Sequence, residues 1–252
     1  MVKKIFAYIG SPKGKNSYTW KLTKTILDQV ISLSDGEIHY KLILPDQIKI
    51  NFCVGCKCCF ENGFCPQDTS DSMESIKEEM LQSDLIILAS PVYAHNVTGN
   101  MKVFIDRITY WMHIFGLAGK FGVTISTSDS NGNEYVNSYL NKIMQYCGLN
   151  VICHFKAMQM INPLTTNNTF SNLDTMPLSR LICDYLTNNH QMSATSFQET
   201  IFQTFKNYML TLEENNIQSS EVKYWKEHGY FDADSYDTVL SKLQEENYKI
   251  LD

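Results

Sequence analysis

Apolar runs and helical patterns alternate along the first 155 residues of the chain. The runs predict strands over residues 3–9, 37–44, 83–90, 119–126 and 149–155. The third run is almost entirely apolar, as expected for a central strand that is covered on both faces. Between the runs, helical patterns appear at 22–33, 99–114 and 134–147. This alternation predicts an α/β fold with a doubly wound, five-stranded parallel sheet.

Residues 156–252 have a different character. A polar, turn-rich segment at 162–169 is typical of a linker. Helical patterns follow over 197–212, near 224–225 and over 235–248; the first has Phe197, Ile201, Phe205, Met209 and Leu212 on one face. We therefore expect two parts, a sheet domain at 1–155 and a helical C-terminal extension at 156–252. The extension either only covers apolar surface or also roofs the ligand site and selects the substrate.

Composition narrows the possible partners. The 252 residues are 44% hydrophobic, with a net charge of -6 and a pI near 5.5. This balance provides no general field for nucleic acid or anionic lipid and favours a small ligand held locally. No apolar run approaches the roughly 18 residues of a membrane span. The chain starts in a strand rather than in a signal-peptide pattern, so we expect a cytoplasmic protein.

The loop after the first strand reads Gly10-Ser11-Pro12-Lys13-Gly14-Lys15-Asn16-Ser17-Tyr18-Thr19 and leads into a helix. A buried strand followed by such a loop directs amides, hydroxyls and the positive end of a helix dipole at one point, which suits a phosphate. An ordinary capped turn between strand and helix is the alternative.

The loops after the third and fourth strands, residues 91–98 and 127–132, fall at the same edge of a parallel sheet, where ligands bind in such folds. They contain hydroxyls, amides, glycine and aromatic groups without a strong charge cluster. Beside a phosphate loop, they suit a flat aromatic cofactor with a phosphate tail. Flavin mononucleotide (FMN) is the natural candidate.

Two motifs carry a family resemblance: Gly10-Ser11-Pro12-Lys13 with Ser17-Tyr18-Thr19, and the stretch from Ser90-Pro91-Val92-Tyr93 to Gly99-Asn100-Met101-Lys102-Val103-Phe104-Ile105-Asp106-Arg107. Over residues 3–155 the chain resembles the flavodoxin-like NAD(P)H-dependent FMN reductase family. The resemblance implies that the FMN phosphate binds at Ser11, Lys13, Ser17, Tyr18 and Thr19. The flavin ring would contact Pro91, Val92, Tyr93, Ala94 and Asn96, and Thr127, Ser128 and Gly132 would approach it.

Two positions depart from this family pattern. The family often has Asn where this chain has Tyr18, and Trp where it has Ala94. We therefore expect Tyr18 to contribute its backbone N–H, and the ring wall to be thinner at Ala94.

A cysteine-rich motif lies between the second and third predicted strands. Cys53, Cys56, Cys59 and Cys65 form a C-x2-C-x2-C-x5-C frame, with Cys58 inside it. Four thiolates in so short a loop can converge on one metal centre. The loop is similar to that of iron-sulfur flavoproteins, a resemblance that implies a [4Fe-4S] cluster. Zinc, a redox dithiol of Cys56 and Cys59, and simple packing of thiols remain open.

Other polar and aromatic groups have structural interpretations. Asp71 and Glu74 predict a capping box. Asp106 and Arg107 predict a structural or interface ion pair rather than catalysis. Trp111, Met112 and His113 suggest core or dimer contacts, and the thiols of Cys147, Cys153 and Cys183 are expected to be inert in the core.

These features support three functional hypotheses. The first is an FMN oxidoreductase that takes hydride from NAD(P)H and reduces a small acceptor such as a quinone, a flavin or an activated alkene. No Gly-x-Gly-x-x-Gly motif is present, so the nicotinamide would stack directly on the flavin. The others are an iron-sulfur electron carrier and a non-catalytic FMN-binding module. Flavin sites of this superfamily commonly lie at a dimer interface, so we expect a homo-oligomer. The catalytic residues stay unassigned, with Tyr93 and His113 as candidate proton donors.

Overall fold

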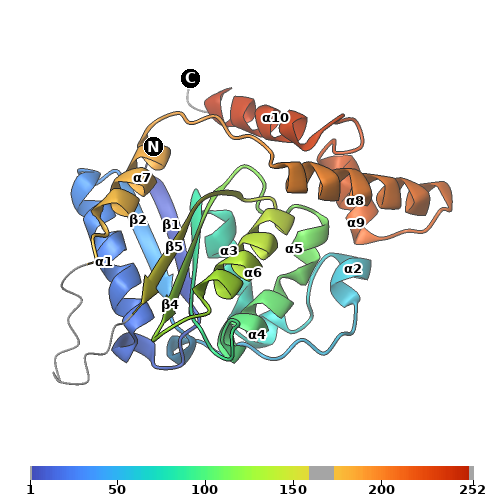
Figure 1. Cartoon of the computed structure of the whole chain (residues 1–252). Coiled ribbons are helices and arrows are strands. Elements are labelled where there is room, and N and C mark those ends of the chain that lie inside the picture. The colour runs from blue at the N-terminus through green and yellow to red at the C-terminus, as the bar shows by residue number, and fades with distance from the viewer. Residues whose placement is uncertain (1, 159–172, 250–252) are drawn as a thin grey trace, which may run out of the picture.

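The computed structural model describes residues 2–158 and 173–249, which form a parallel sheet flanked by helices (Figure 1). The strands are β1 (Lys3–Ile9), β2 (Ile38–Ile43), β3 (Leu85–Pro91), β4 (Phe121–Ser128) and β5 (Asn150–Met158). They pair in the order β2-β1-β3-β4-β5, all parallel. This is the flavodoxin-like order, and it confirms the predicted fold class.

Helices cover both faces of the sheet. Figure 1 shows α1 (Tyr18–Leu33) and α7 (Met176–Thr187) on one side, and α3 (Met73–Leu81), α4 (Gly99–Arg107), α5 (Thr109–His113) and α6 (Asn133–Tyr146) on the other. Helix α7 lies beyond residue 155 and packs on α1, where the Ser179 hydroxyl donates to the Ile26 carbonyl at 3.2 Å. Three short 3-10 helices, η1 (Gly14–Asn16), η2 (Pro45–Gln47) and η3 (Asp68–Ser70), lie in the connections.

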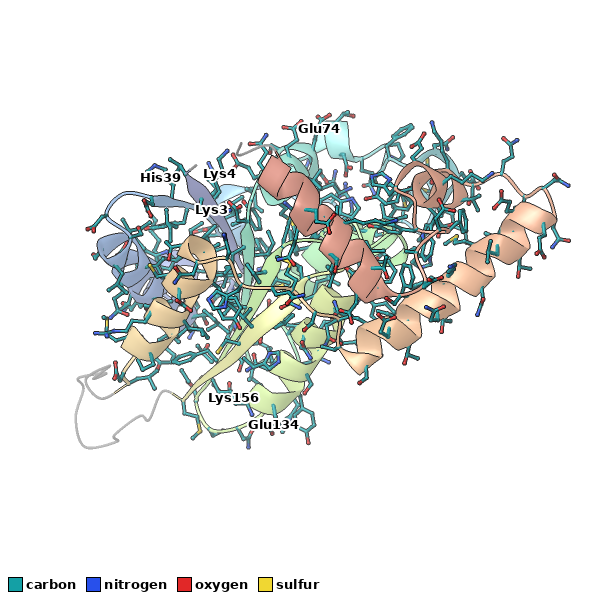
Figure 2. All side chains as sticks on the ribbon, turned by 90° about the horizontal axis from the view of Figure 1, so that it is seen from above. Lys3, Lys4, His39, Glu74, Glu134 and Lys156 are labelled. Carbon is teal, nitrogen blue, oxygen red and sulfur yellow. The ribbon has the colours of Figure 1, made fainter. Side chains whose placement is uncertain are left out.

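The two ends of the strands have different surroundings. Figure 2 shows Lys3, Lys4 and His39 near the amino ends of β1 and β2, whereas Glu134 and Lys156 lie on another side of the molecule. Helix α10 (Tyr236–Lys249) crosses the molecule at the amino ends of the strands. The Tyr236 hydroxyl donates to the Gly148 carbonyl at 2.8 Å, just before β5. The carboxyl ends of the strands face away from this helix.

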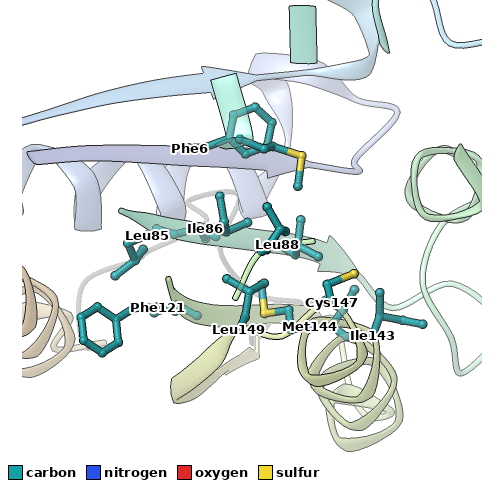
Figure 3. Packing of buried hydrophobic residues seen from close by; sticks show 14 of the residues in the cluster. Phe6, Leu85, Ile86, Leu88, Phe121, Ile143, Met144, Cys147 and Leu149 are labelled. Atoms are coloured by element: carbon teal, nitrogen blue, oxygen red, sulfur yellow. The ribbon is translucent and has the colours of Figure 1, made fainter. Parts of the chain in front are cut away.

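The core lies between the sheet and its helices. Figure 3 shows Leu85, Ile86 and Leu88 of β3 beside Phe6 of β1, with Met144 and Cys147 approaching from α6 and its C-terminus. All are at most 2% exposed. Burial of each large apolar side chain stabilises the fold by about 1.5–3 kcal/mol. The central strands are therefore the most firmly held part of the molecule.

The helix predicted over 99–114 was wrong as one unit, because α4 ends at Arg107 and α5 begins at Thr109. Between them Ile108 has φ −109° and ψ 11°, outside the helical region. The Thr109 hydroxyl donates to the Asp106 carbonyl at 2.9 Å and so satisfies a carbonyl at the break.

The predicted capping box was also wrong. Helix α3 starts at Met73 with Ser72 as its N-cap residue. Asp71 instead accepts hydrogen bonds from the backbone N–H groups of Met73 and Asn51, each at 2.9 Å, and pairs with Arg107. The carboxylate therefore has a tertiary partner rather than a purely local role.

The C-terminal part contains α8 (Ser196–Glu214), α9 (Ser220–Glu227) and α10. Helix α8 packs on α6, α9 and α10, and α9 packs on the short helix α2 (Cys58–Asn62) of the cysteine loop. Phe115 joins Phe202, Trp225 and Tyr236 in an aromatic cluster beneath them. The predicted linker at 162–169 lies outside the described residues. Of the helices in the two described ranges, none is long and apolar enough to cross a membrane.

Candidate functional site

Three loops meet at the carboxyl edge of the sheet. The hydroxyls of Thr19 and Thr127, 108 positions apart, lie 2.7 Å from each other. The Thr98 hydroxyl donates to the Gly10 carbonyl, and the Val92 N–H donates to the Thr127 carbonyl at 2.8 Å. The structure therefore joins the loops after β1, β3 and β4, as expected from the fold.

The loop after β1 presents hydroxyls at the start of a long helix. Ser17 is the N-cap of α1 and its side chain accepts the Trp20 N–H at 3.0 Å, which leaves the hydroxyl hydrogen available to donate. Ser11 and Ser17 are buried, whereas Lys13 is exposed. The first turn of this 16-residue helix has no acidic residue. The positive end of its dipole is thus not neutralised from within the helix.

Other groups modify this loop. Tyr18 is half-buried, and burial raises the pKa of its hydroxyl. The carboxylate of Asp46 packs closely against Gly14, whose φ of 51° places it in the left-handed region. Lys13 and Lys15 flank this glycine in sequence and supply positive charge. The charges near the loop are therefore mixed, and hydroxyl and amide donors must provide most of the anion specificity.

Thr19 and Thr127 lie beneath the edge rather than on its surface. Thr19 is 1% exposed and Thr127 is 2% exposed. Because one hydroxyl donates to the other, the accepting hydroxyl retains a hydrogen to donate elsewhere. The pair thus connects the start of α1, next to the loop predicted to bind phosphate, to the end of β4.

The loop after β3 contains a strained tight turn. Tyr93 and Asn96 exchange two backbone hydrogen bonds, of 2.9 and 3.0 Å. Between them Ala94 and His95 have φ of 49° and 58°, in the left-handed region that costs a non-glycine residue about 1 kcal/mol or more. Tyr93 remains 43% exposed at this edge. Surrounding contacts therefore hold an unfavourable backbone at the predicted ring site, as is common at functional sites.

The loop after β4 closes against this turn at Gly132, the N-cap of α6, where φ is 88°. A Cβ atom there would lie 2.7 Å from Val92 Cγ1, so only glycine permits this approach. Nearby, Ser128 is buried and accepts from Asn133 Nδ2 at 3.0 Å. The oxygens Ser126 Oγ and Asn133 Oδ1 are buried and lack a hydrogen-bond partner among the described residues.

This donor set fits FMN. Hydroxyls, amides and a helix N-terminus suit the phosphate, and Pro91, Val92 and Tyr93 offer an apolar and aromatic surface to the ring. The unpartnered polar oxygens at the same end of β4 are consistent with a polar ligand or bound water. The thirteen predicted positions therefore fall on or beside three joined loops, and five of them, Ser11, Ser17, Thr19, Thr127 and Ser128, are buried.

The cysteine loop does not form a ready ligand set. Cys53 and Cys56 are exposed, whereas Cys58, Cys59 and Cys65 are half-buried. In the parts of the chain that the structure describes, no three Cys, His, Asp or Glu side chains lie close enough to hold one metal ion. In this conformation the four predicted ligands thus do not fit a cluster. The pKa of Cys59 is raised overall, first by burial and then by the nearby Cys65; a backbone hydrogen bond opposes this rise, Cys53 adds to it, and Lys77 opposes it least.

A buried arginine holds both ends of this loop. The Arg107 side chain, fully buried at the end of α4, donates to the Asn51 carbonyl at 2.9 Å, to Asp68 Oδ1 at 2.7 Å and to Asp71. Lys77 adds a 2.6 Å contact to Asp68. We call Arg107, Asp68 and Asp71 the Arg107 anchor.

The charges of the Arg107 anchor support each other. Burial opposes ionisation of Asp71, but hydrogen bonds from Arg107 and from two backbone N–H groups, with the charge of Arg107, lower its pKa overall. Burial likewise works against the Arg107 cation, but its carboxylate partners raise its pKa overall. Asp106 pairs instead with Lys102, so Asp106 and Arg107 each form an ion pair but not with each other. In the sequence, the one indication of this anchor is that Arg107 ends a helix whose other face is apolar.

The remaining candidates divide between core and cysteine loop. Trp111 is 8% exposed and belongs to the core. Met112 and His113 are half-buried, and His113 Nδ1 lies 2.7 Å from Glu221 Oε1 of α9. Burial raises the pKa of the Cys147 thiol to about 12, in keeping with an inert core group. Cys153 and Cys183 are half-buried, and burial is the largest cause of their raised pKa values.

Known flavoproteins resemble this chain in sequence and in fold. Residues 3–160 match the family model described as NADPH-dependent FMN reductase. An iron-sulfur flavoprotein of Archaeoglobus fulgidus is 29% identical over 90% of this chain and 99% of its own length, and one of Methanosarcina thermophila is 29% identical over 53% of this chain and 71% of its own. The apo form of an NADH:FMN oxidoreductase (EMOB) superposes with a TM-score of 0.51 at 22% identity, covering 78% of this chain and 94% of that one. This last likeness concerns the fold.

Proposed function

The chain belongs to the NADPH-dependent FMN reductase family and is an FMN-dependent oxidoreductase, and on that basis we propose that it oxidises NAD(P)H and reduces a small acceptor. Quinones, free flavins and activated alkenes are the acceptor classes that suit an open flavin face. The observation that carries the proposal is the junction of three loops at one sheet edge, tied by Thr19 and Thr127.

When bound, FMN supplies hydride acceptance and the transfer of one or two electrons. The protein supplies binding and orientation. Ser11, Lys13 and Ser17 hold the phosphate at the start of α1, while Tyr18 contributes through its backbone. The turn at Tyr93–Asn96 would position the ring, and the apolar side chains of Pro91 and Val92 would shield it from water. Ala94 adds little bulk, which leaves room for a nicotinamide.

Of the two candidate proton donors, Tyr93 lies in the loop after β3, at the carboxyl edge of the sheet, and is 43% exposed. His113 instead lies among Phe60, Phe205 and Glu221, next to the cysteine loop. We therefore propose Tyr93 rather than His113 as the group that protonates a reduced product. No step of hydride uptake from NAD(P)H requires a side-chain acid.

An iron-sulfur electron carrier is the second candidate. The relatives named iron-sulfur flavoproteins favour it, as does a five-cysteine loop held by the Arg107 anchor. Cys53, Cys56, Cys59 and Cys65 would be the ligands, after a rearrangement that brings the exposed pair to the half-buried pair.

We further propose that the FMN-binding unit is residues 1–155, with 156–252 as an extension that covers helices and the cysteine loop. Phe52, Val54 and Phe64 of the cysteine loop are 75%, 71% and 59% exposed, which supports burial against a second subunit in a homodimer. The eight free thiols are consistent with a cytoplasmic site of action.

Anaerobic purification followed by reduction tests the proposal. The flavin band should bleach on addition of NADH or NADPH and return when a quinone is added. Parallel iron and sulfide analysis should find substoichiometric metal if the enzyme assignment holds. Stoichiometric iron with a broad visible shoulder would favour the carrier, and a flavin that neither nicotinamide reduces would overturn NAD(P)H oxidation and favour the carrier or a non-catalytic FMN-binding module.

A further inference from the structure

The start of α9 contacts the cysteine helix α2 directly. The Ser220 hydroxyl lies 2.7 Å from the Phe60 carbonyl oxygen and 3.1 Å from that of Cys59, across 160 and 161 positions of sequence. Ser220 is half-buried at this contact. The C-terminal part of the chain is thus in contact with the backbone that carries the thiols.

Helix α2 needs such a contact. It has five residues, too few to be stable as an isolated helix. Its final carbonyls lack helical partners, as at every helix C-terminus. The Gly63 N–H satisfies the Cys59 carbonyl at 3.0 Å, and the Ser220 hydroxyl is placed to satisfy the Phe60 carbonyl. The distant hydroxyl therefore completes the end of this helix.

Further contacts hold α2 between α5 and α9. The Phe60 ring packs edge-on against His113 at 4.9 Å and Tyr110 at 5.9 Å between ring centroids. Burial raises the pKa of Tyr110, and its hydrogen bond to Ser220 partly opposes that rise. From α9, Glu221 binds His113 at 2.7 Å and the Trp225 indole donates to the His113 carbonyl at 3.0 Å.

The thiols differ in a way that follows these contacts. Cys58 and Cys59, on α2, are half-buried, whereas Cys53 and Cys56, which precede it, are exposed. Gly55, between Cys53 and Cys56, and Lys57, between Cys56 and Cys58, have φ of 67° and 61°, so the backbone changes direction before α2 begins. Helix α9 thus contacts the part of the loop, α2, whose two thiols are partly shielded from solvent.

We propose that Ser220 is a positioning residue for Cys59: through the carbonyls at the end of α2, helix α9 sets the orientation and solvent exposure of this thiol. The C-terminal extension then has a role beyond covering the core, because it determines which cysteines of the loop are available to react or to bind. The inference concerns the thiols alone and does not require that FMN be bound.

Alkylation of each cysteine under limiting iodoacetamide, followed by peptide mass spectrometry of the reduced full-length protein, tests this. Ser220→Ala should accelerate modification of Cys59 by about threefold to tenfold, the change in exposed population expected from one lost hydrogen bond. Ser220→Thr, which keeps a hydroxyl, should restore the wild-type rate. Ser235→Ala is the matched control, since the Ser235 hydroxyl caps the start of α10 by bonding to the N–H and the hydroxyl of Thr238.

Hydrogen exchange at amides 58–63 provides a second measurement and should rise in Ser220→Ala alone. The inference is overturned if Ser220→Ala leaves the Cys59 rate unchanged, if Ser220→Thr reacts as fast as Ser220→Ala, or if Cys147 accelerates equally and so reports global opening. FMN content, measured in the same samples, should be equal in all variants. A loss of FMN binding in every sample would count against the proposed function without bearing on the Cys59 rates.

Discussion

The carboxyl edge of the sheet, where we propose that FMN binds, and the cysteine loop are held in different ways. At the carboxyl edge, hydroxyl and backbone contacts such as Thr19–Thr127 and Val92–Thr127 join loops that the sheet already brings together. The cysteine loop has only a short helix of its own and depends on side chains from α4 and α9. The difference indicates that the proposed flavin site is largely preformed, whereas the geometry of the thiols depends on distant residues.

The largest effect should come from breaking the Arg107 anchor. Arg107→Met leaves two carboxylates with side chains at most 14% exposed and without their main partner, and should lower the free energy of unfolding by about 3–5 kcal/mol. Lys102→Met, which breaks the exposed pair with Asp106, should cost no more than about 1 kcal/mol. Urea denaturation measures both. Equal midpoints for the two variants would show that the cysteine loop does not depend on this anchor.

A smaller effect is expected at the contact between the loops after β3 and β4. Gly132→Ala combines an unfavourable φ of 88° with a 2.7 Å clash against Val92, and should cost about 1–3 kcal/mol and weaken FMN binding. Gly36→Ala is the control, because Gly36 has the same φ but nothing within 4 Å of an added Cβ. Thermal unfolding and FMN titration of both variants separate the contact from backbone strain. FMN loss in both variants alike would argue that the contact is irrelevant.

The phosphate assignment is tested by a change that keeps the helix cap. Ser17→Asp retains an N-cap acceptor for α1 but places a carboxylate beside the phosphate, so FMN affinity should fall by about tenfold or more with little change in melting temperature. Ser219→Asp makes the same change at the cap of α9 and should leave FMN affinity unaltered. If Ser17→Asp binds FMN like the wild type, the phosphate lies elsewhere.

The smallest effect is confined to acid. Because the folded-state pKa of Asp71 is lowered overall, its ionised form contributes stability above the ordinary carboxyl pKa of about 4, and this contribution is lost as pH falls through the folded-state value. Wild-type stability should therefore decline more steeply below about pH 4 than that of Arg107→Met. Denaturation series across this range provide the comparison, and parallel curves would contradict the role assigned to the pair.

The sequence predicted the regular part of this molecule well. The apolar runs predicted the five strands close to their observed limits, and the three edge loops followed from the fold. The break at Ile108 carries no proline or glycine to signal it. Asp71 was assigned a local cap because its partner Arg107 lies 36 positions away, and α2 is supported by Ser220 across 160 positions. Spacing alone could not predict contacts of that kind.

The most direct test of the account is an anaerobic titration of the purified protein with FMN, followed by flavin fluorescence. If FMN binds at the three-loop edge, the protein should be yellow and should quench flavin fluorescence up to a stoichiometric endpoint. The Ser17→Asp variant should need more FMN than the wild type to reach the same quenching. A colourless protein that leaves the fluorescence unchanged at excess FMN would contradict the assignment of the three-loop edge as a flavin site.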